Sequence, residues 1–207
     1  MKHLAIIAAL LPLLAACGTA PPPQRYLLSA PTVATARPEA ARVRVALERV
    51  GIPGYLEEDR IASEAPGPRI VYDEDDRWAE DPRVAITRAM EGTLSAEPAL
   101  IVLAEPWPRR FRPDIKLQVD FDRFLRTADG GASMSGHFIV MAGDGDEVLT
   151  IEPFALTEAG EGTAPSYDVF FGAASRAIQE LSDQIVRALP EPEAPSADSG
   201  ADSGAGA

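Results

Sequence analysis

Few residues of this sequence could take part in covalent chemistry. The chain contains one cysteine, Cys17, and two histidines, His3 and His137. A single cysteine cannot form an internal disulfide, and a structural metal site needs about four ligands, usually Cys and His. Because His3 precedes Cys17 in the N-terminal segment, His137 is the one histidine left for a folded body. Cys17 is therefore a reactive thiol, an intermolecular cross-link or a site of covalent modification.

The residues around Cys17 favour modification. A short basic segment opens the chain and an apolar run follows from Leu4 to Ala16. This run is shorter than the roughly 18–20 residues that cross a bilayer, so it predicts a secretory signal peptide. Residues 14–17 (Leu-Ala-Ala-Cys) resemble the lipobox of bacterial lipoproteins, in which cleavage before the cysteine leaves a lipidated N-terminus. The alternative is an ordinary signal peptide that is cut near Ala20.

Composition divides the chain into four segments. We expect a signal peptide at 1–16, a lipidated Cys17 with a Pro-rich tether at 17–24, one folded domain at 25–189 and a disordered tail at 190–207. The tail contains no aromatic or β-branched residue, so it cannot bury enough apolar area to offset ordering. The net charge of −13 argues against nucleic acid as a partner, because that binding depends on Lys and Arg. Membrane contact is expected through the N-terminal lipid.

Hydrophobic patterns predict one sheet with two helices. The expected strands are 25–30, 42–50, 69–73, 99–104, 115–122, 135–141 and 148–156. One helix is expected to begin at Asp81-Pro82 and a second to span 167–189. The run 99–104 is apolar throughout, which predicts a strand covered on both faces. The expected fold class is α/β: a three-layer-like single domain with one mixed, largely antiparallel sheet and two main helices packed on it.

Catalytic and metal motifs are scarce. His137 lies in a predicted strand without a Gly-x-Ser-x-Gly elbow, which favours a structural or surface role. No phosphate-binding glycine motif follows a strand. The acidic stretches 73–81 and 144–147 lack the spacing of an EF-hand, so a solvated loop and a hairpin turn are favoured. We expect no catalytic residue, no metal site, no cofactor and no enzyme activity.

One segment runs against the overall charge. Residues 107–112 combine two aromatic side chains with three arginines: Trp107, Arg109, Arg110, Phe111 and Arg112. Aromatic residues and arginine are enriched at interfaces, so this loop is a candidate contact for a partner or for lipid head groups. The alternative is a loop whose arginines pair with nearby carboxylates.

The order of the motifs resembles the ABC-type transport auxiliary lipoprotein family, the PqiC-like proteins. The resemblance includes RYLLSAP after the cysteine, VRVALERVGIPGYLEEDRI, IVYDEDDRWAEDPRVAITRAMEGTL, DIKLQVDFDRF and SYDVFFGAASRAIQELSDQIVRAL. It implies a non-catalytic, periplasm-facing lipoprotein, usually of the outer membrane. The implied partners are a periplasmic MCE-domain tunnel protein and an ABC transporter or permease, and a homo-oligomeric ring is compatible with such a tunnel.

Two other functions remain open from the residues. A lipid-anchored binding protein would hold a small apolar or amphipathic ligand in a cavity between helix and sheet. An anchored hydrolase would need a nucleophile within hydrogen-bond reach of His137 in a cleft.

Overall fold

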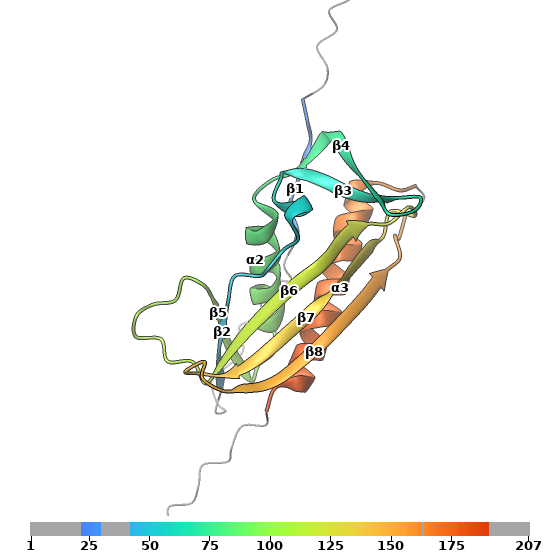
Figure 1. Cartoon of the computed structure of the whole chain (residues 1–207). Helices are drawn as coiled ribbons and strands as arrows, with labels where there is room; N and C mark the ends of the chain where they lie inside the picture. The colour runs from blue at the N-terminus through green and yellow to red at the C-terminus, as the bar shows by residue number, and fades with distance from the viewer. Residues whose placement is uncertain (1–21, 30–41, 163, 191–207) are drawn as a thin grey trace, which may run out of the picture.

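The computed structural model describes residues 22–29, 42–162 and 164–190. Figure 1 shows their strands and helices. The strands are β1 (Arg25–Tyr26), β2 (Val43–Leu47), β3 (Arg60–Ala65), β4 (Arg69–Trp78), β5 (Leu100–Ala104), β6 (Ile115–Arg126), β7 (Ala132–Ala142) and β8 (Val148–Glu158). The helices are α2 (Pro82–Leu94) and α3 (Tyr167–Ala188), and a short 3-10 helix, η2, covers Gly54–Leu56.

The strands form one open mixed sheet around β6. On one side, β6 pairs antiparallel with β7, and β7 pairs antiparallel with β8. On its other side, β2 runs parallel to the start of β6 and β3 meets its last residue. The sheet continues from β2 to β5, and from β3 through β4 to β1. The expected fold class, a single α/β domain with a mixed sheet and two main helices, is confirmed, and the longest ladders are antiparallel.

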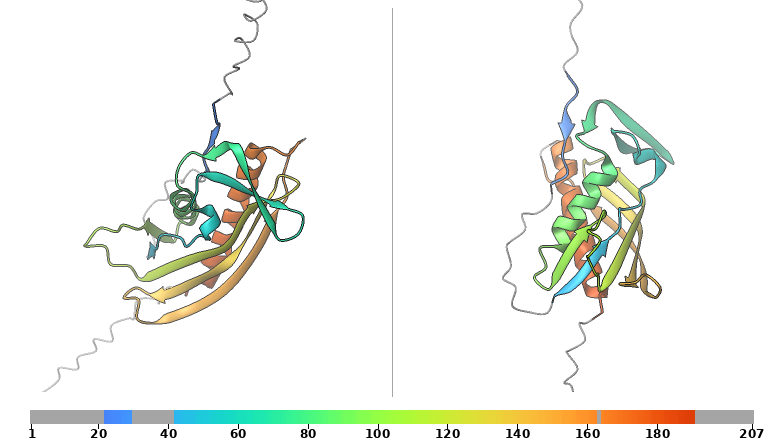
Figure 2. Two further views of the ribbon diagram at one scale, coloured as in Figure 1. Left: turned by 45° about the horizontal axis from the view of Figure 1, so that its top comes forward. Right: turned by 90° about the vertical axis from the view of Figure 1, so that its left-hand side faces the viewer.

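The two helices share one face of the sheet, where they lie side by side (Figure 2). Along α3, apolar residues recur at steps of three and four and are buried: Phe170, Phe171, Ala173, Ala174, Ala177, Ile178, Leu181 and Ile185. This stripe faces the sheet, as expected for an amphipathic helix. Along β6 and β7, buried and half-exposed residues alternate, because successive side chains of a strand point to opposite faces.

Aromatic rings fill the space between α3 and the sheet. The Trp78 ring meets the Phe171 ring edge-on at 4.8 Å, and the Phe170 and Phe171 rings lie 5.0 Å apart. Phe121 contacts Phe154 at 5.3 Å on the sheet side of this cluster. The rings prefer such tilted contacts because their faces carry negative and their edges positive potential.

Both helices begin where the sequence places a polar cap. The Asp81 side chain accepts a hydrogen bond from the Arg83 amide at 2.8 Å, with Pro82 at the first helical position. The Ser166 hydroxyl accepts one from the Val169 amide at 3.3 Å. These bonds satisfy amides that have no partner within the helix.

Four expectations about single strands need correction. β1 is shorter than expected and covers two residues. β3 was not expected, because RIASEA has no apolar alternation, and β4 runs on through the acidic stretch to Trp78. β5 is not covered on both faces, since Ile101 is 39% exposed while Leu100 and Val102 are buried. β5 pairs with β2 on one side, which leaves its other side at the edge of the sheet.

A candidate docking surface

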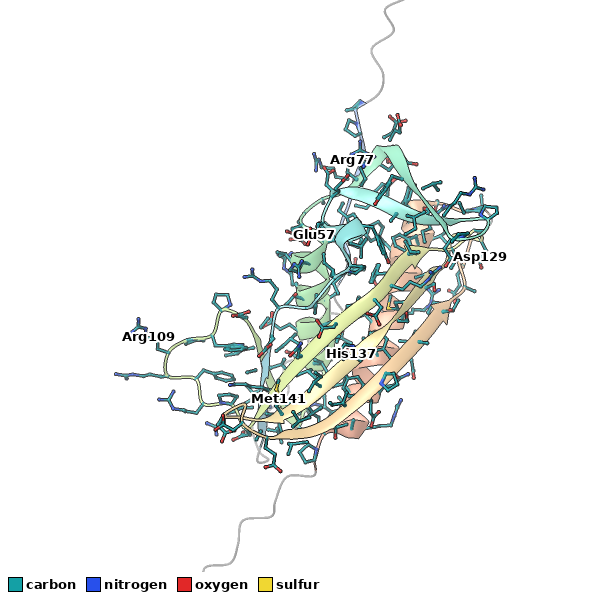
Figure 3. All side chains as sticks on the ribbon, in the orientation of Figure 1. Glu57, Arg77, Arg109, Asp129, His137 and Met141 are labelled. Atoms are coloured by element: carbon teal, nitrogen blue, oxygen red, sulfur yellow. The ribbon has the colours of Figure 1, made fainter. Side chains whose placement is uncertain are left out.

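The loop between β5 and β6 holds the residues singled out by their charge. It leaves β5 through a cis peptide bond between Glu105 and Pro106. The Trp107 indole Nε1 donates to the Leu103 carbonyl oxygen at 2.9 Å, which ties the ring to the end of β5. Figures 1 and 3 show the loop projecting from the body, with Arg109 at its outer part.

The arginines of this loop are not neutralised by carboxylates. Arg112 donates to the carbonyl oxygens of Arg109 and Phe111, at 3.0 and 3.2 Å. Arg109 and Arg110 are exposed. Among the described residues, no ion pair joins any of these three arginines to an acidic side chain. The alternative reading, in which the arginines pair with local carboxylates, is therefore not what the structure shows.

The acidic residue next to the loop has another partner. Asp114 forms a bidentate pair with Arg44, with the two Arg44 side-chain nitrogens at 3.0 and 2.6 Å. The hydrogen bonds from Arg44 hold the pKa of the Asp114 carboxyl below its usual value, although partial burial opposes them. Asp114 is therefore paired with Arg44 of β2 and does not neutralise the loop arginines.

The N-terminal segment enters the body at the opposite end. The Arg77 amide donates to the Gln24 carbonyl oxygen at 2.9 Å, and the Ala79 amide donates to the Tyr26 carbonyl oxygen at 2.8 Å. The Tyr26 ring stacks on Phe171 at 5.7 Å, and Leu28 is buried. Figure 1 shows this segment arriving at the top of the molecule, and the loop after β5 projects at the lower left.

His137 has the surroundings of a surface residue. It lies on the face of β7 turned away from the helices, and its imidazole Nε2 is 3.7 Å from an Asp120 carboxylate oxygen. That oxygen also accepts a hydrogen bond from the Gln118 amide at 2.7 Å. Among the described residues, no hydrogen bond joins His137 to a hydroxyl that could act as a nucleophile, as a hydrolase would require.

The acidic stretch in β4 is organised by an arginine. One Asp73 carboxylate oxygen accepts the amides of Asp75 and Asp76, at 2.8 and 2.9 Å. The Arg77 guanidinium donates to the carbonyl oxygens of Asp73, Glu74 and Asp76. The backbone oxygens that could coordinate a cation are therefore occupied by Arg77, and no cluster of metal-ligating side chains occurs among the described residues.

The structure does not describe the predicted lipidation residue or the two ends of the chain. Cys17, the predicted signal peptide and most of the predicted tether lie outside the described residues, as does the predicted tail after Pro190. No helix among the described residues is long and apolar enough to cross a membrane.

Comparison with known proteins identifies the relatives of this fold. A family model described as "ABC-type transport auxiliary lipoprotein component" matches residues 26–186, which is well over half of the chain. The chain belongs to this family. The match begins at the last residue of β1 and ends near the end of α3, so it covers the region in which the sequence motifs follow one another.

Solved structures support the same fold for this auxiliary lipoprotein. One crystal structure of an uncharacterised protein has a TM-score of 0.66 at 20% identity and covers 81% of this chain and 98% of its own. The protein XCC0632 from Xanthomonas campestris, of the DUF330 family, has a TM-score of 0.63 at 12% identity and covers 79% and 92%. Among curated proteins, no relative matches the sequence.

The sequence identifies the basic loop as a candidate contact, but it does not identify the exposed apolar start of β8 beside it. The exposed aliphatic side chains at the start of β8, Val148, Leu149 and Ile151, were assigned only to a strand. The signal was present in the run VLTI, which does not alternate between apolar and polar residues as a half-buried strand should.

Proposed function

We propose that this protein is a non-catalytic subunit of an envelope transport system, anchored by a lipid on Cys17 and facing the periplasm. Its role is to dock a periplasmic tunnel protein of the MCE type, beside an ABC transporter or permease. The cargo is a lipid or another hydrophobic compound, and the anchoring leaflet belongs to the outer membrane. The family match supports the transport system, because its members are transport auxiliary lipoproteins.

The position of the basic loop is the observation that supports the docking role. The basic loop with Trp107, Arg109, Arg110, Phe111 and Arg112 lies at the end of the body opposite to the segment that leads back to Cys17. A tethered body with that geometry presents its unpaired charges away from its own anchor. Arginine and aromatic residues are enriched at interfaces and among the residues that contribute most to binding.

The core does not favour the binding-protein alternative. The space between α3 and the sheet is occupied by buried rings, including Trp78, Phe124 and Phe170. A groove of about 330 Å³ lies between α2 and α3, but its walls are mostly polar and include Glu97, Asp183 and Arg187. Such a groove does not match the mostly apolar pockets that hold small hydrophobic ligands.

The anchor is tested by removing the thiol. A Cys17→Ala variant should move from the membrane fraction to the soluble periplasmic fraction and lose metabolic labelling with palmitate. A Ser29→Ala variant, which retains Cys17, is the control and should remain membrane-bound. Palmitate labelling that persists in Cys17→Ala would contradict lipidation at this position.

The docking role is tested by photo-crosslinking in intact envelopes. A crosslinking amino acid at position 110 should capture an MCE-domain protein, whereas the same probe at position 69 should not. Arg69 is an exposed arginine on the β3–β4 hairpin, with no ion pair to a carboxylate among the described residues. Equal capture from both positions, or capture of no envelope transport component, would contradict the proposed role.

A further inference from the structure

The basic loop is continuous with an exposed apolar area of the sheet. A side-chain carbon built on Gly143 would lie 2.0 Å from the Pro113 carbonyl oxygen, so the end of the loop contacts the β7–β8 hairpin. The Lys116 ammonium donates to the Asp144 carbonyl oxygen of the same hairpin at 2.8 Å. β8 begins directly after this hairpin, and Figure 3 places Met141, at the end of β7, toward the same end of the molecule as Arg109.

The start of β8 exposes large aliphatic side chains. Val148 is 53% exposed, Leu149 41% and Ile151 61%. Ile151 pairs with Ile139 of β7, so the apolar area extends onto the neighbouring strand. We call the loop residues 107–112 together with Val148, Leu149 and Ile151 the distal surface. A patch that combines arginine, aromatic and aliphatic side chains is typical of a protein interface.

The charge of the distal surface contrasts with the rest of the protein. The chain carries a net charge of −13. Several arginines elsewhere in the body are paired with carboxylates, as Arg60 is with Glu58 and Arg123 with Glu64, although the exposed Arg69 has no such pair among the described residues. The loop arginines lack such partners among the described residues. The complementary occupant therefore carries carboxylates, and it carries apolar side chains to cover the start of β8.

The length of the tether separates the distal surface from the anchoring membrane. This step rests on the proposed lipidation of Cys17. Seven residues lead from Cys17 to Gln24, which span at most about 25 Å when fully extended. The 22 residues of α3 span about 33 Å along the body between the tether entry and the distal end. A tether of this length cannot reach along the whole body, so the body cannot turn over and stand with its distal end on the anchoring membrane.

The C-terminal tail of this chain is a poorer occupant. Residues 191–207 carry four carboxylate side chains but no aromatic, β-branched, leucine or methionine residue. They could offset the arginine charges, but they have no side chain that would cover Val148 or Ile151.

We propose that the distal surface binds an acidic, amphipathic segment of a periplasmic partner protein. Arg109 and Arg110 attract its carboxylates, and the start of β8 takes up its apolar face. Pro153 in the middle of β8 has no amide to donate, so the occupant is held by side chains and not by extending the sheet along the whole edge.

The experiment uses the full mature chain and a synthetic amphipathic helical peptide, which has glutamates on one face and leucines on the opposite face. Binding is measured by fluorescence anisotropy at two salt concentrations. We expect this peptide to bind more tightly than a Lys/Leu peptide or a Glu/Ser peptide of equal length, and more weakly at higher salt. The variant Arg109→Ser/Arg110→Ser should weaken binding about fivefold or more, and Ile151→Ser should weaken it with little change in salt dependence.

Controls separate this proposal from the others. Arg69→Ser removes a comparable exposed arginine and should leave peptide affinity unchanged. Equal affinity for the Glu/Leu and Lys/Leu peptides would overturn the proposal, and so would unchanged binding in Arg109→Ser/Arg110→Ser. Binding to phosphatidylglycerol vesicles that is lost in the same variant would assign the surface to lipid head groups instead.

Two further arms test the other occupants. Truncation after Pro190 should leave peptide affinity unchanged, and a large gain in affinity would show that the tail occupies the surface. Sedimentation should give the same mass for the wild type and Arg109→Ser/Arg110→Ser. Loss of an oligomer in that variant would assign the surface to a second copy. The crosslinking in envelopes tests the transport role separately, because it does not depend on the peptide.

Discussion

At the residue scale, a tyrosine and an aspartate connect α3 to the acidic stretch of β4. The Tyr167 hydroxyl donates to Asp73 at 2.8 Å, while the other Asp73 oxygen accepts two backbone amides. Burial raises the pKa of Asp73, but these three hydrogen bonds outweigh it and the net pKa is lowered. Burial and the neighbouring carboxylate raise the pKa of Tyr167. Asp73 therefore stays ionised and holds the start of α3 against β4.

Replacing the tyrosine should produce a pH-dependent loss of stability. Because the folded pKa of Asp73 lies below its value of 3.8 in the unfolded chain, its contribution is present above that pH and is lost as pH falls through the folded pKa. Tyr167→Phe should lower the free energy of unfolding by about 1–2 kcal/mol at neutral pH. Urea unfolding should show a smaller loss at acidic pH, once the pH has fallen through the lowered pKa of Asp73 in the folded protein.

A second tyrosine serves as the matched control. The Tyr72 hydroxyl donates to the uncharged Tyr55 carbonyl oxygen at 3.2 Å. Tyr72→Phe should cost about 0.5–1.5 kcal/mol, similarly at both pH values. A Tyr167→Phe effect that is also independent of pH would show that Asp73 does not titrate through this contact.

At the element scale, the long β6–β7 ladder depends on one close backbone approach. Gly136 lies on β7 opposite Phe121, and a side-chain carbon there would come within 1.9 Å of the Asp120 carbonyl oxygen. The register of the ladder shifts between Phe121 and Arg123, next to this point. Such a bulge bends the strand and increases its local twist.

An alanine at this position should destabilise the sheet. We expect Gly136→Ala to lower the free energy of unfolding by about 2–3 kcal/mol, because the obstructing atom belongs to the backbone and cannot rotate away. Gly54→Ala is the control, since a side-chain carbon at Gly54 meets no atom within 4 Å. It should be neutral, or stabilising by up to about 1 kcal/mol. Equal stability of the two variants in thermal unfolding would disprove the close approach.

The N-cap of α2, Asp81, leads to a second prediction at this scale. Asp81→Ala should cost about 1 kcal/mol, because the Arg83 amide loses its acceptor. Asp81→Asn keeps an acceptor oxygen and should restore most of the stability. If both variants lose the same free energy in urea unfolding, the contribution comes from the charge of Asp81 and not from its hydrogen bond.

The elements also show what the sequence can and cannot predict. Alternation predicted β6, and the Asp-Pro signal predicted the start of α2, because both follow local rules. β3 was missed because its residues RIASEA carry no periodic signal, and its pairing with β4 depends on a turn at Gly67. The sequence singles out the loop arginines, but it does not show that they lack carboxylate partners. That depends on Arg44 of β2, which pairs with Asp114 and is distant from it in sequence.

At the scale of the whole molecule, opposite ends differ in charge. Acidic residues gather near the tether entry, including Asp59, Glu74, Asp76 and Asp168. The distal end is mixed, because the loop arginines share it with the exposed carboxylates of Asp144, Asp146 and Glu147 in the β7–β8 hairpin. An anionic leaflet repels the acidic end, and the repulsion acts over about 8–10 Å at physiological salt. This repulsion does not hold the body upright, because the same leaflet attracts the loop arginines. The proposed orientation, with the distal surface directed into the periplasm, therefore rests on the predicted tether, which is shorter than the body.

Energy transfer can measure this orientation. Dye at position 74 or position 110 of the lipidated chain in proteoliposomes should transfer to an acceptor in the bilayer, and transfer should be clearly stronger from position 74. A spacer of about 20 Gly/Ser residues, inserted between Cys17 and Gln24, has a mean span of about 25 Å but can extend further, and should reduce the difference. Equal transfer from both positions in the wild type would show a body that lies flat on the bilayer.

The attachment of β1 also determines how the protein bears mechanical load. In the proposed role the protein is anchored in one membrane and docked to a partner, and it would be pulled whenever the distance between them changes. The pull enters through Gln24 and Tyr26, whose carbonyl oxygens are bonded sideways to β4. Force directed along β1 therefore shears these bonds together and does not open them one at a time. Stacking of Tyr26 on Phe171 passes part of the load directly to α3, so tension reaches the helix layer without first straining the β6–β7–β8 ladder.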